Sequence, residues 1–311
     1  MKISVIIPCY NEEEVLPFSY DRFLSVMEKS KYDYEFLFIN DGSKDNTGSI
    51  LAELADRNQN VKVMSFSRNF GHQCAVSAGI SNCSGDVAVI IDVDLQDPPE
   101  LIPDMIDLYL KEQCNVVYAV RKQRKGETFF KLFTASLFYK LLAKLSDVEI
   151  PRNTGDFRLI DRIVIDTYKA LPERNKFIRG LISWMGFKQI PFYYEREERF
   201  AGSTKYPFRK MLKLASHGIF GFSKKPIKIA TTLGIISIIL AFLMMIWVLY
   251  LNIFIPERLV PGWASTIAIV LFMGGVQLFT IGILGEYIGS IFDETKKRPE
   301  YIIKEKLNFD R

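Results

Sequence analysis

The sequence predicts an α/β protein: a mostly parallel sheet with helices on both faces, followed by an interfacial helix and two transmembrane helices. Two observations support this fold class. The first 120 residues alternate short runs rich in Val, Ile and Phe with longer segments whose apolar residues recur at helical spacing. Such alternation favours parallel strands with covering helices. The last third of the chain instead holds two long runs without a single charged residue.

Five strands and three helices are expected in the first part of the chain. Each strand candidate ends at a turn or a polar cluster, and the candidates cover residues 3–7, 34–40, 61–66, 86–92 and 115–120. Helices are expected over residues 12–30, 44–59 and 99–113. Ligands gather at the carboxyl ends of parallel strands. Polar clusters follow the first, second and fourth strands, so we expect them to share one edge of the sheet.

Two amphipathic segments come next. Residues 126–145 are very apolar on one side, which fits a lipid-facing or ligand-lining helix and a core helix packed on the sheet equally well. Residues 207–225 interleave Phe, Met, Leu and Ile with Arg and Lys. That pattern suits a helix lying in the membrane interface.

The two uncharged runs cover residues 229–251 and 263–284. A helix needs about 20 apolar residues to cross a bilayer, so both runs are long enough. The alternative is a pair of buried core helices, which rarely contain uncharged runs of this length. Three basic residues precede the first run and three follow the second, whereas the connection between the runs carries one Arg beside one Glu. The positive-inside rule therefore predicts two spans of the inner (plasma) membrane with both termini in the cytoplasm.

Composition argues against several classes of protein. The net charge of +4 is too small for a general nucleic-acid-binding surface. The four cysteines are scattered, which indicates free thiols in a reducing compartment rather than disulfides. With only two histidines, His72 and His217, a zinc site is not expected. The apolar run at the N-terminus is too short for a signal peptide.

Three carboxylates follow the fourth strand, in the stretch VIIDVDLQDPPE from Val89 to Glu100. Asp92 and Asp94 are one residue apart, so at a strand end both can turn their oxygens toward one ion. Mg²⁺ and Mn²⁺ prefer a few carboxylates, with waters and phosphates completing the coordination. Asp97 precedes two prolines and is expected to cap the next helix instead.

The other two polar clusters suit a nucleotide. PCYNEE ends the first strand and offers Pro8, Tyr10 and Glu12 as a wall for a base. NDGSKDNT ends the second strand, where Asp41 could accept hydrogen bonds from a base or ribose. Gly42 permits the sharp turn that this cluster requires.

Six segments, taken in order, resemble family 2 glycosyltransferases of the GT-A (Rossmann-like) fold, and more narrowly the polyprenyl-phosphate glycosyltransferases. These segments are VIIPCYNEEE, FINDGSKDNT, SRNFGHQCAVSAGI, DVDLQDPPE, TGDFRLID and RFAGSTKY. Each motif alone is weak, but the ordered set covers nearly the whole chain, and the two uncharged runs match the bactoprenol glucosyltransferase type. The resemblance implies inverting transfer of one sugar, with glucose expected, from a UDP-sugar to undecaprenyl phosphate. The product would be a lipid-linked donor for cell-surface glycans.

The resemblance also implies roles for individual residues. The nucleotide-binding set is matched by Pro8, Tyr10, Glu12, Asp41 and Asp92. The motif for metal and diphosphate is matched by Asp92, Asp94 and Gln96. The residues implied in catalysis are Asp94 and Asp156, the second beside the reacting sugar. Contacts to the diphosphate and the acceptor phosphate are implied for Arg121, Arg199, Ser203 and Lys205, and contacts in the sugar or acceptor region for Arg68 and Gln73. Arg124 is a further candidate cation for guiding the acceptor phosphate.

These roles agree with the chemistry of the reaction. Breaking the bond between a sugar and a nucleoside diphosphate develops charge on the leaving oxygen, which a bound Mg²⁺ or Mn²⁺ neutralises. A phosphate acceptor is already anionic near pH 7 and needs cationic guidance more than a general base. Asp156 is therefore expected to orient the sugar or stabilise its developing positive charge. His72 lies in a matching segment, but a lone histidine is more often a helix-start or surface residue.

Three other functions fit parts of the pattern. The donor could be GDP-mannose with dolichol phosphate as acceptor. A non-catalytic membrane scaffold could bind a nucleotide sugar without turnover, although three carboxylate clusters disfavour it. A processive polysaccharide synthase is disfavoured because the sequence shows two spans and no QxxRW-like motif.

The expected organisation has four parts. They are a cytoplasmic glycosyltransferase domain (1–206), an interfacial segment (207–228), a two-helix membrane hairpin (229–288) and a cytoplasmic tail (289–311). Gly282, Gly285 and Gly289 form a GxxxG-like pattern through which the helices could pack into a homo-oligomer.

Overall fold

The structure is a computed structural model, and it describes residues 1–121, 154–174, 176–195, 223–254 and 262–309. The amphipathic segment 126–145 lies outside the described residues, as does the interfacial segment up to residue 222. So do four of the predicted phosphate-binding residues: Arg124, Arg199, Ser203 and Lys205.

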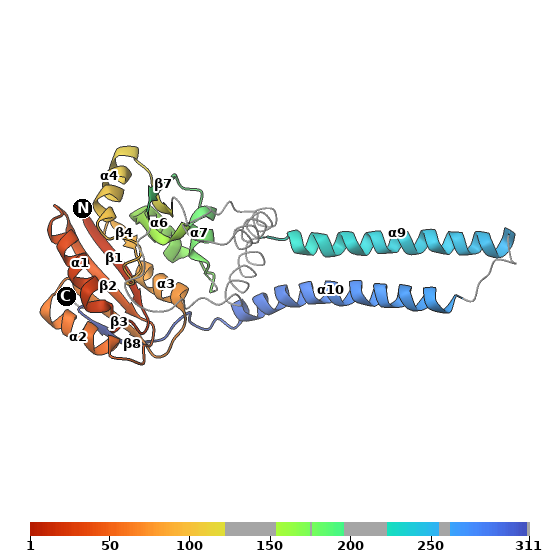
Figure 1. The fold of residues 1–311 in the computed structure, drawn as a ribbon, viewed down its shortest axis with the longest axis horizontal. Helices are drawn as coiled ribbons and strands as arrows, with labels where there is room; N and C mark the ends of the chain where they lie inside the picture. The colour runs from red at the N-terminus through yellow and green to blue at the C-terminus, as the bar shows by residue number, and fades with distance from the viewer. Residues whose placement is uncertain (122–153, 175, 196–222, 255–261, 310–311) are drawn as a thin grey trace.

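An eight-stranded sheet forms the centre of the α/β domain (Figure 1). The strands are β1 (Lys2–Cys9), β2 (Asp33–Asn40), β3 (Val61–Phe66), β4 (Val87–Ile90), β5 (Val116–Arg121), β6 (Thr154–Asp161), β7 (Gln189–Tyr194) and β8 (Ile303–Leu307). They lie in the order β7-β5-β6-β4-β1-β2-β3-β8. Pairing is parallel except where β6 joins β4 and β5 and where β8 joins β3. The mostly parallel sheet and its first five strands are confirmed, while β6, β7 and β8 were not predicted.

Helices cover both faces of the sheet, as predicted. One face packs against α1 (Leu16–Glu28), α2 (Thr47–Arg57) and α4 (Leu101–Glu112). The other packs against α3 (His72–Asn82), α6 (Arg162–Ala170) and α7 (Ile178–Trp184). Side chains alternate in direction along β1, so this strand contributes to the hydrophobic core on each face of the sheet. Val5 and Ile7 lie in the core with α1, α2 and α4, and Ile6 lies in the core with α3, α6 and α7.

Strand register brings the polar clusters to one edge. The last residues of β1 and β2, Cys9 and Asn40, lie side by side. β4 runs parallel to β1, with Ile90 opposite Ile6. Because β6 runs antiparallel to β4, the start of β6 lies beside the carboxyl end of β4. Residues after β4 and at the start of β6 therefore meet at the same rim.

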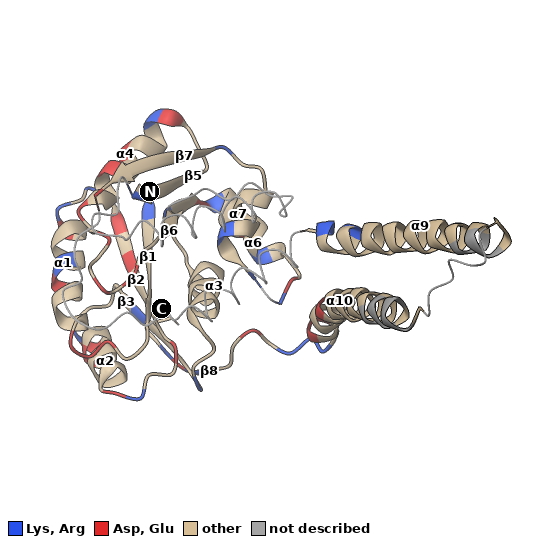
Figure 2. Cartoon of the chain, turned by 45° about the vertical axis from the view of Figure 1, so that its right-hand side comes forward, with Lys and Arg blue, Asp and Glu red and all other residues tan. Residues whose placement is uncertain are grey.

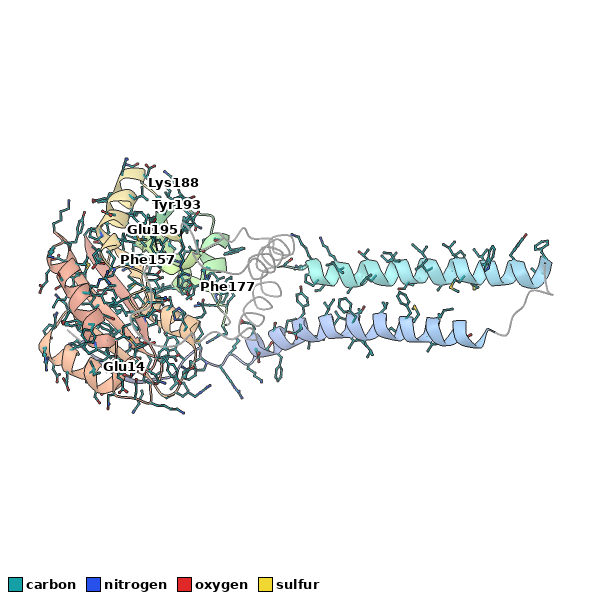
Figure 3. The ribbon with its side chains drawn as sticks, viewed as in Figure 1. Glu14, Phe157, Phe177, Lys188, Tyr193 and Glu195 are labelled. Carbon is teal, nitrogen blue, oxygen red and sulfur yellow. The ribbon has the colours of Figure 1, made fainter. Side chains whose placement is uncertain are left out.

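Two long helices, α9 (Lys225–Phe254) and α10 (Trp263–Thr295), run side by side away from the domain (Figure 1). Both are long and apolar enough to cross a membrane. Charged side chains lie only at their domain-proximal ends, and apolar side chains project outward along the rest (Figures 2 and 3). Such exposure is typical of a surface that contacts lipid. The two predicted helices are confirmed, and α10 extends to Thr295.

The chain returns to the domain after α10. β8 pairs antiparallel with β3 and forms an edge of the sheet. The Nδ2 of Asn308 then donates to the carbonyl oxygens of Ala55 (2.7 Å) and Val61 (2.9 Å). The segment expected only as a tail therefore contributes a strand.

Candidate active site

The loops after β1 and β2 are joined by hydrogen bonds. The backbone N–H of Asn11 donates to Ser43 Oγ (3.0 Å), and that of Glu12 donates to Thr47 Oγ1 (2.9 Å). These bonds hold the two loops in one arrangement and leave Tyr10 half-buried at the rim. The two joined loops lie at the place where a nucleotide base is predicted to bind.

Asp41 holds the segment that leads into α3. Its carboxylate accepts hydrogen bonds from the backbone N–H groups of Phe70 (2.7 Å) and Gly71 (2.9 Å). Burial raises the pKa of Asp41, and these two donors act in the opposite direction. Gly42 has φ +64°, and a Cβ there would lie 2.3 Å from the carbonyl carbon of Arg68. The expected sharp turn at Gly42 is confirmed.

Two predicted nucleotide-binding residues, Pro8 and Glu12, differ in exposure from Arg68, which is predicted to lie in the sugar or acceptor region. Pro8 is buried within β1, Glu12 is half-buried and Arg68 is exposed. The guanidinium of Arg68 stacks over the Phe70 ring at 4.2 Å from its centroid. Contacts of these residues with a ligand stay predictions.

The DVDLQ stretch after β4 alternates between half-buried and buried positions. Asp92, Asp94 and Gln96 are half-buried at the rim, and the residues between them are buried. Leu95 has φ +57°, a left-handed conformation that non-glycine residues rarely adopt. The backbone N–H of Gln96 donates to Asp94 Oδ1 at 3.2 Å. The turn thus leaves two carboxylates and one amide partly exposed at the rim.

Asp97 does not cap the next helix, so that expectation was wrong. Pro98 and Pro99 follow it and have no N–H to donate, and α4 begins only after them without a side-chain cap. Asp97 is instead buried, where it accepts a hydrogen bond from the hydroxyl of Tyr194 and lies 3.7 Å from Arg121 Nη2. Arg121 also donates to the Tyr194 hydroxyl at 3.2 Å. The predicted phosphate contact of Arg121 stays a prediction.

Asp156, near the start of β6, contacts three side chains. Its Oδ2 lies 2.9 Å from His72 Nε2 and 3.3 Å from Gln73 Nε2, both at the start of α3. Its Oδ1 lies 3.1 Å from Arg179 Nε, in α7. The same His72 nitrogen is 3.8 Å from Asp92 Oδ1. His72 therefore stands between the carboxylate of β6 and the carboxylate after β4.

The charges in this cluster are strongly coupled. Burial alone would raise the pKa of Asp156, but Arg179 and His72 outweigh it and hold the pKa well below its usual range. Burial would lower the pKa of His72, but Asp156 and Asp92 raise it to about 9. Burial and the neighbouring carboxylates Asp156 and Asp94 raise the pKa of Asp92 to about 6. At neutral pH, Asp156 is ionised and His72 is protonated.

Backbone contacts fix the geometry behind this cluster. Arg158 donates to the carbonyl oxygens of Gly155 (3.1 Å) and Asp156 (3.3 Å). Gln73 Oε1 accepts from the backbone N–H of Ile178 at 3.2 Å, which ties α3 to α7. Roles for Arg158 and Arg179 were not predicted, and His72 was expected to be a helix-start or surface residue. The contacts of Arg179 and His72 with Asp156 join distant parts of the chain, so no local pattern marks them.

The donor set at this rim suits a hard cation. Asp92 and Asp94 offer carboxylate oxygens on one turn, and burial together with the nearby carboxylates Asp156 and Asp94 raises the pKa of Asp92. Within the described ranges, no three His, Cys, Asp or Glu side chains form a complete metal cage. Mg²⁺ takes one or two carboxylates and completes its coordination with waters and substrate phosphates. Asp92 and Asp94 therefore fit an ion shared with a diphosphate.

Comparison with known families decides the identity of the domain. Residues 4–169, more than half of the chain, match the model of glycosyl transferase family 2. The chain belongs to this family. Residues 225–291 match a second model, the GtrB C-terminal hairpin, and cover most of α9 and α10. The GT-A fold and the resemblance seen in the motifs are thereby confirmed.

Relatives of this glycosyltransferase match both the α/β domain and the two long helices. The "Uncharacterized glycosyltransferase YkcC" of Bacillus subtilis is 51% identical, with coverage of 100% of this chain and 95% of the relative. The "Prophage bactoprenol glucosyl transferase homolog" of Escherichia coli is 44% identical, with coverage of 98% and 99%. The "Bactoprenol glucosyl transferase" of Shigella phage SfV is 43% identical, with coverage of 98% of both chains.

Among solved structures, a mannosyltransferase from Pyrobaculum calidifontis in complex with GDP-Man and Mn²⁺ is similar to the chain. It has a TM-score of 0.47 and 14% identity, with coverage of 95% of this chain and 88% of that one.

Proposed function

We propose that the protein transfers glucose from UDP-glucose to a polyprenyl phosphate, undecaprenyl phosphate above all, with inversion at the anomeric carbon. The observation that carries this proposal is the 43% identity to a bactoprenol glucosyl transferase over 98% of both chains. The similarity extends over the catalytic domain and the hairpin alike, so one set of relatives supports both the sugar transfer and the lipid acceptor. UDP as the nucleotide follows from the family resemblance.

In this proposal the loop pair after β1 and β2 binds the nucleotide. Tyr10 and Glu12 lie in the first of these loops, and Asp41 holds the segment that leads into α3. Asp92 and Asp94 hold Mg²⁺ or Mn²⁺, with Gln96 beside them. When bound, the metal supplies positive charge to the diphosphate leaving group.

Asp156 then acts as a fixed negative charge beside the sugar. Its depressed pKa makes it a poor base, which suits a reaction whose acceptor is already an anion. Its carboxylate stabilises positive charge that develops on the sugar ring. His72 is protonated and contacts Asp156, so it supplies a cation near the place where phosphates are expected.

The proposed site lies on the cytoplasmic face of the membrane. The start of α9 and the end of α10 both lie beside the α/β domain (Figure 1), so one side of the membrane would hold the domain and both ends of the hairpin. Lysines gather at these ends, as the positive-inside rule requires of the cytoplasmic side. The four-part organisation and packing of α10 through Gly282, Gly285 and Gly289 belong to the same proposal.

A donor screen tests the proposal. Purified protein in detergent is mixed with undecaprenyl phosphate, Mg²⁺ or Mn²⁺ and one labelled sugar nucleotide at a time, and label in the solvent-extractable lipid is counted. We expect label from UDP-glucose and its loss when EDTA removes the metal. Label only from GDP-mannose would make the protein a mannose synthase. Absence of lipid product with every common sugar nucleotide would favour a non-catalytic scaffold.

A further inference from the structure

The segment that follows α10 contacts two of the elements that hold the candidate active site. Glu300 lies five residues beyond Thr295, the last residue of α10. Its Oε2 accepts a hydrogen bond from Ser77 Oγ at 2.7 Å, and its Oε1 lies 3.1 Å from Lys176 Nζ. The Lys176 and Glu300 side chains are only 8% and 14% exposed, so this ion pair is shielded from water.

Both partners of Glu300 belong to segments that hold the Asp156 cluster. Ser77 lies in α3, whose first two residues, His72 and Gln73, contact the Asp156 carboxylate. Lys176 comes two residues before α7, whose Arg179 contacts the same carboxylate. Glu300 therefore links α3 to the segment before α7, in addition to the hydrogen bond between Gln73 and Ile178.

The last turn of α10 holds the same segment before α7. The backbone N–H of Arg174 donates to both carboxylate oxygens of Glu294, each at 3.0 Å. The Nζ of Lys176 also lies over the Tyr168 ring, 4.7 Å from its centroid. In Figure 3, Phe177, which follows Lys176, lies on the side of the domain that faces the long helices. The second membrane helix and the residues before α7 are thus in direct contact.

We propose that Glu300 is a positioning residue for glycosyl transfer. By holding α3 and the segment before α7 together, it sets the spacing of His72, Gln73 and Arg179 around Asp156 and links that spacing to α10. The inference rests on the proposed role of Asp156. Docking of the tail does not require Glu300, because β8 pairs with β3 and the Tyr301 ring stacks on a phenylalanine of β3 at 4.8 Å.

The test compares Glu300→Gln with a matched control, Glu305→Gln. Both variants remove one negative charge from the same segment, but Glu305 is exposed on β8. We expect Glu300→Gln to lower kcat about tenfold with the donor KM within twofold, because small displacements at a reacting centre are costly. Glu305→Gln is expected to keep wild-type kcat. Lys176→Met should reproduce the fall, and the double variant should fall no further, since both changes break one ion pair.

A second readout does not depend on turnover. The chain has two histidines, so the ¹³C signal of the His72 ring can be followed by NMR in labelled protein and assigned with a His217→Gln variant. We expect Glu300→Gln to move the His72 signal and Glu305→Gln to leave it in place. An unmoved His72 signal, or additive falls in kcat for the two single variants, would overturn the inference. If wild-type protein makes no lipid product, the proposed function fails, and the NMR comparison still decides the role of Glu300.

Discussion

Two carboxylate centres lie at opposite ends of the parallel strands, here called the amino edge and the carboxyl edge of the sheet, and they differ in their neighbouring residues. At the amino edge, Glu35 of β2 accepts hydrogen bonds from Ser4 Oγ (2.6 Å) and from the N–H and hydroxyl of Ser84 (2.8 and 2.7 Å). Lys62 and Lys2 lie 2.9 and 3.1 Å from its Oε2. At the carboxyl edge, Asp156 has partners of the same kinds: a hydrogen-bond donor and cations.

The two centres differ in how many other carboxylates lie nearby and in how far the side chains are exposed to solvent. The Glu35 side chain is 2% exposed, and its contacts are with groups that neutralise or satisfy it. Asp156 is 12% exposed, and its partner His72 also faces Asp92, whose pKa the nearby carboxylates help to raise. A buried carboxylate whose neighbours are hydrogen-bond donors and cations stabilises the fold, whereas carboxylates that lie beside one another at a more exposed rim are suited to bind a metal ion.

The largest expected effect is on activity at the carboxyl edge. Asp156→Asn keeps the side-chain size but removes the charge, and we expect kcat to fall by about 10²–10³, as for loss of a preorganised electrostatic group. Transfer of labelled glucose to lipid measures kcat, and donor binding is measured separately. Near-full turnover with intact donor binding would remove Asp156 from the mechanism.

The proposed metal requirement should distinguish two of the three aspartates in the DVDLQD stretch, Asp94 and Asp97. We expect Asp94→Ala to raise the Mn²⁺ concentration for half-maximal activity at least about tenfold, because Asp94 is a proposed ligand. Asp97→Asn should leave that concentration unchanged and lower thermal stability, since Asp97 is buried against Tyr194 and Arg121. Titration of activity with metal is the measurement. An equal shift in both variants would contradict the division.

The residues of the two centres also show which parts of the fold and of the candidate site can be predicted from the sequence. The parallel strands and the carboxylates after β4 were predictable because apolar runs and turns are local signals. β8 was missed since it is an edge strand with charged, exposed residues in the sequence IKEKL. His72 and Asp156 are 84 residues apart, and no local pattern marks such a pair. Glu35 likewise reads as an ordinary strand residue until its distant partners are known.

At the amino edge the expected effect is on stability. Contacts with Ser4, Ser84 and Lys62 overcome the effect of burial and lower the pKa of Glu35 to about 2. Relative to an unfolded value near 4.5, this shift corresponds to about 3 kcal/mol of folding free energy at neutral pH. Because the folded pKa is the lower one, the contribution is complete above about pH 5 and is lost as the pH falls toward about 2.

Glu35→Gln should therefore lower the thermal midpoint in detergent by several degrees at pH 7. The difference from wild type should narrow as the pH is lowered below 5, and kcat per folded molecule should stay within twofold. Melting curves across pH, together with transfer assays, check both statements. A fall in kcat as large as that of Asp156→Asn would mean that the two edges are not functionally distinct.

The smallest effect is expected from a third carboxylate, which has good geometry but little burial. Glu100 forms a bidentate salt bridge with Arg22, with Nε–Oε1 at 2.6 Å and Nη2–Oε2 at 2.8 Å. The two side chains are 49% and 30% exposed, so water screens their attraction. We expect Glu100→Gln to cost less than about 1 kcal/mol and to leave kcat unchanged. A stability loss as large as that of Glu35→Gln would show that geometry, and not burial, sets the contribution of these carboxylates.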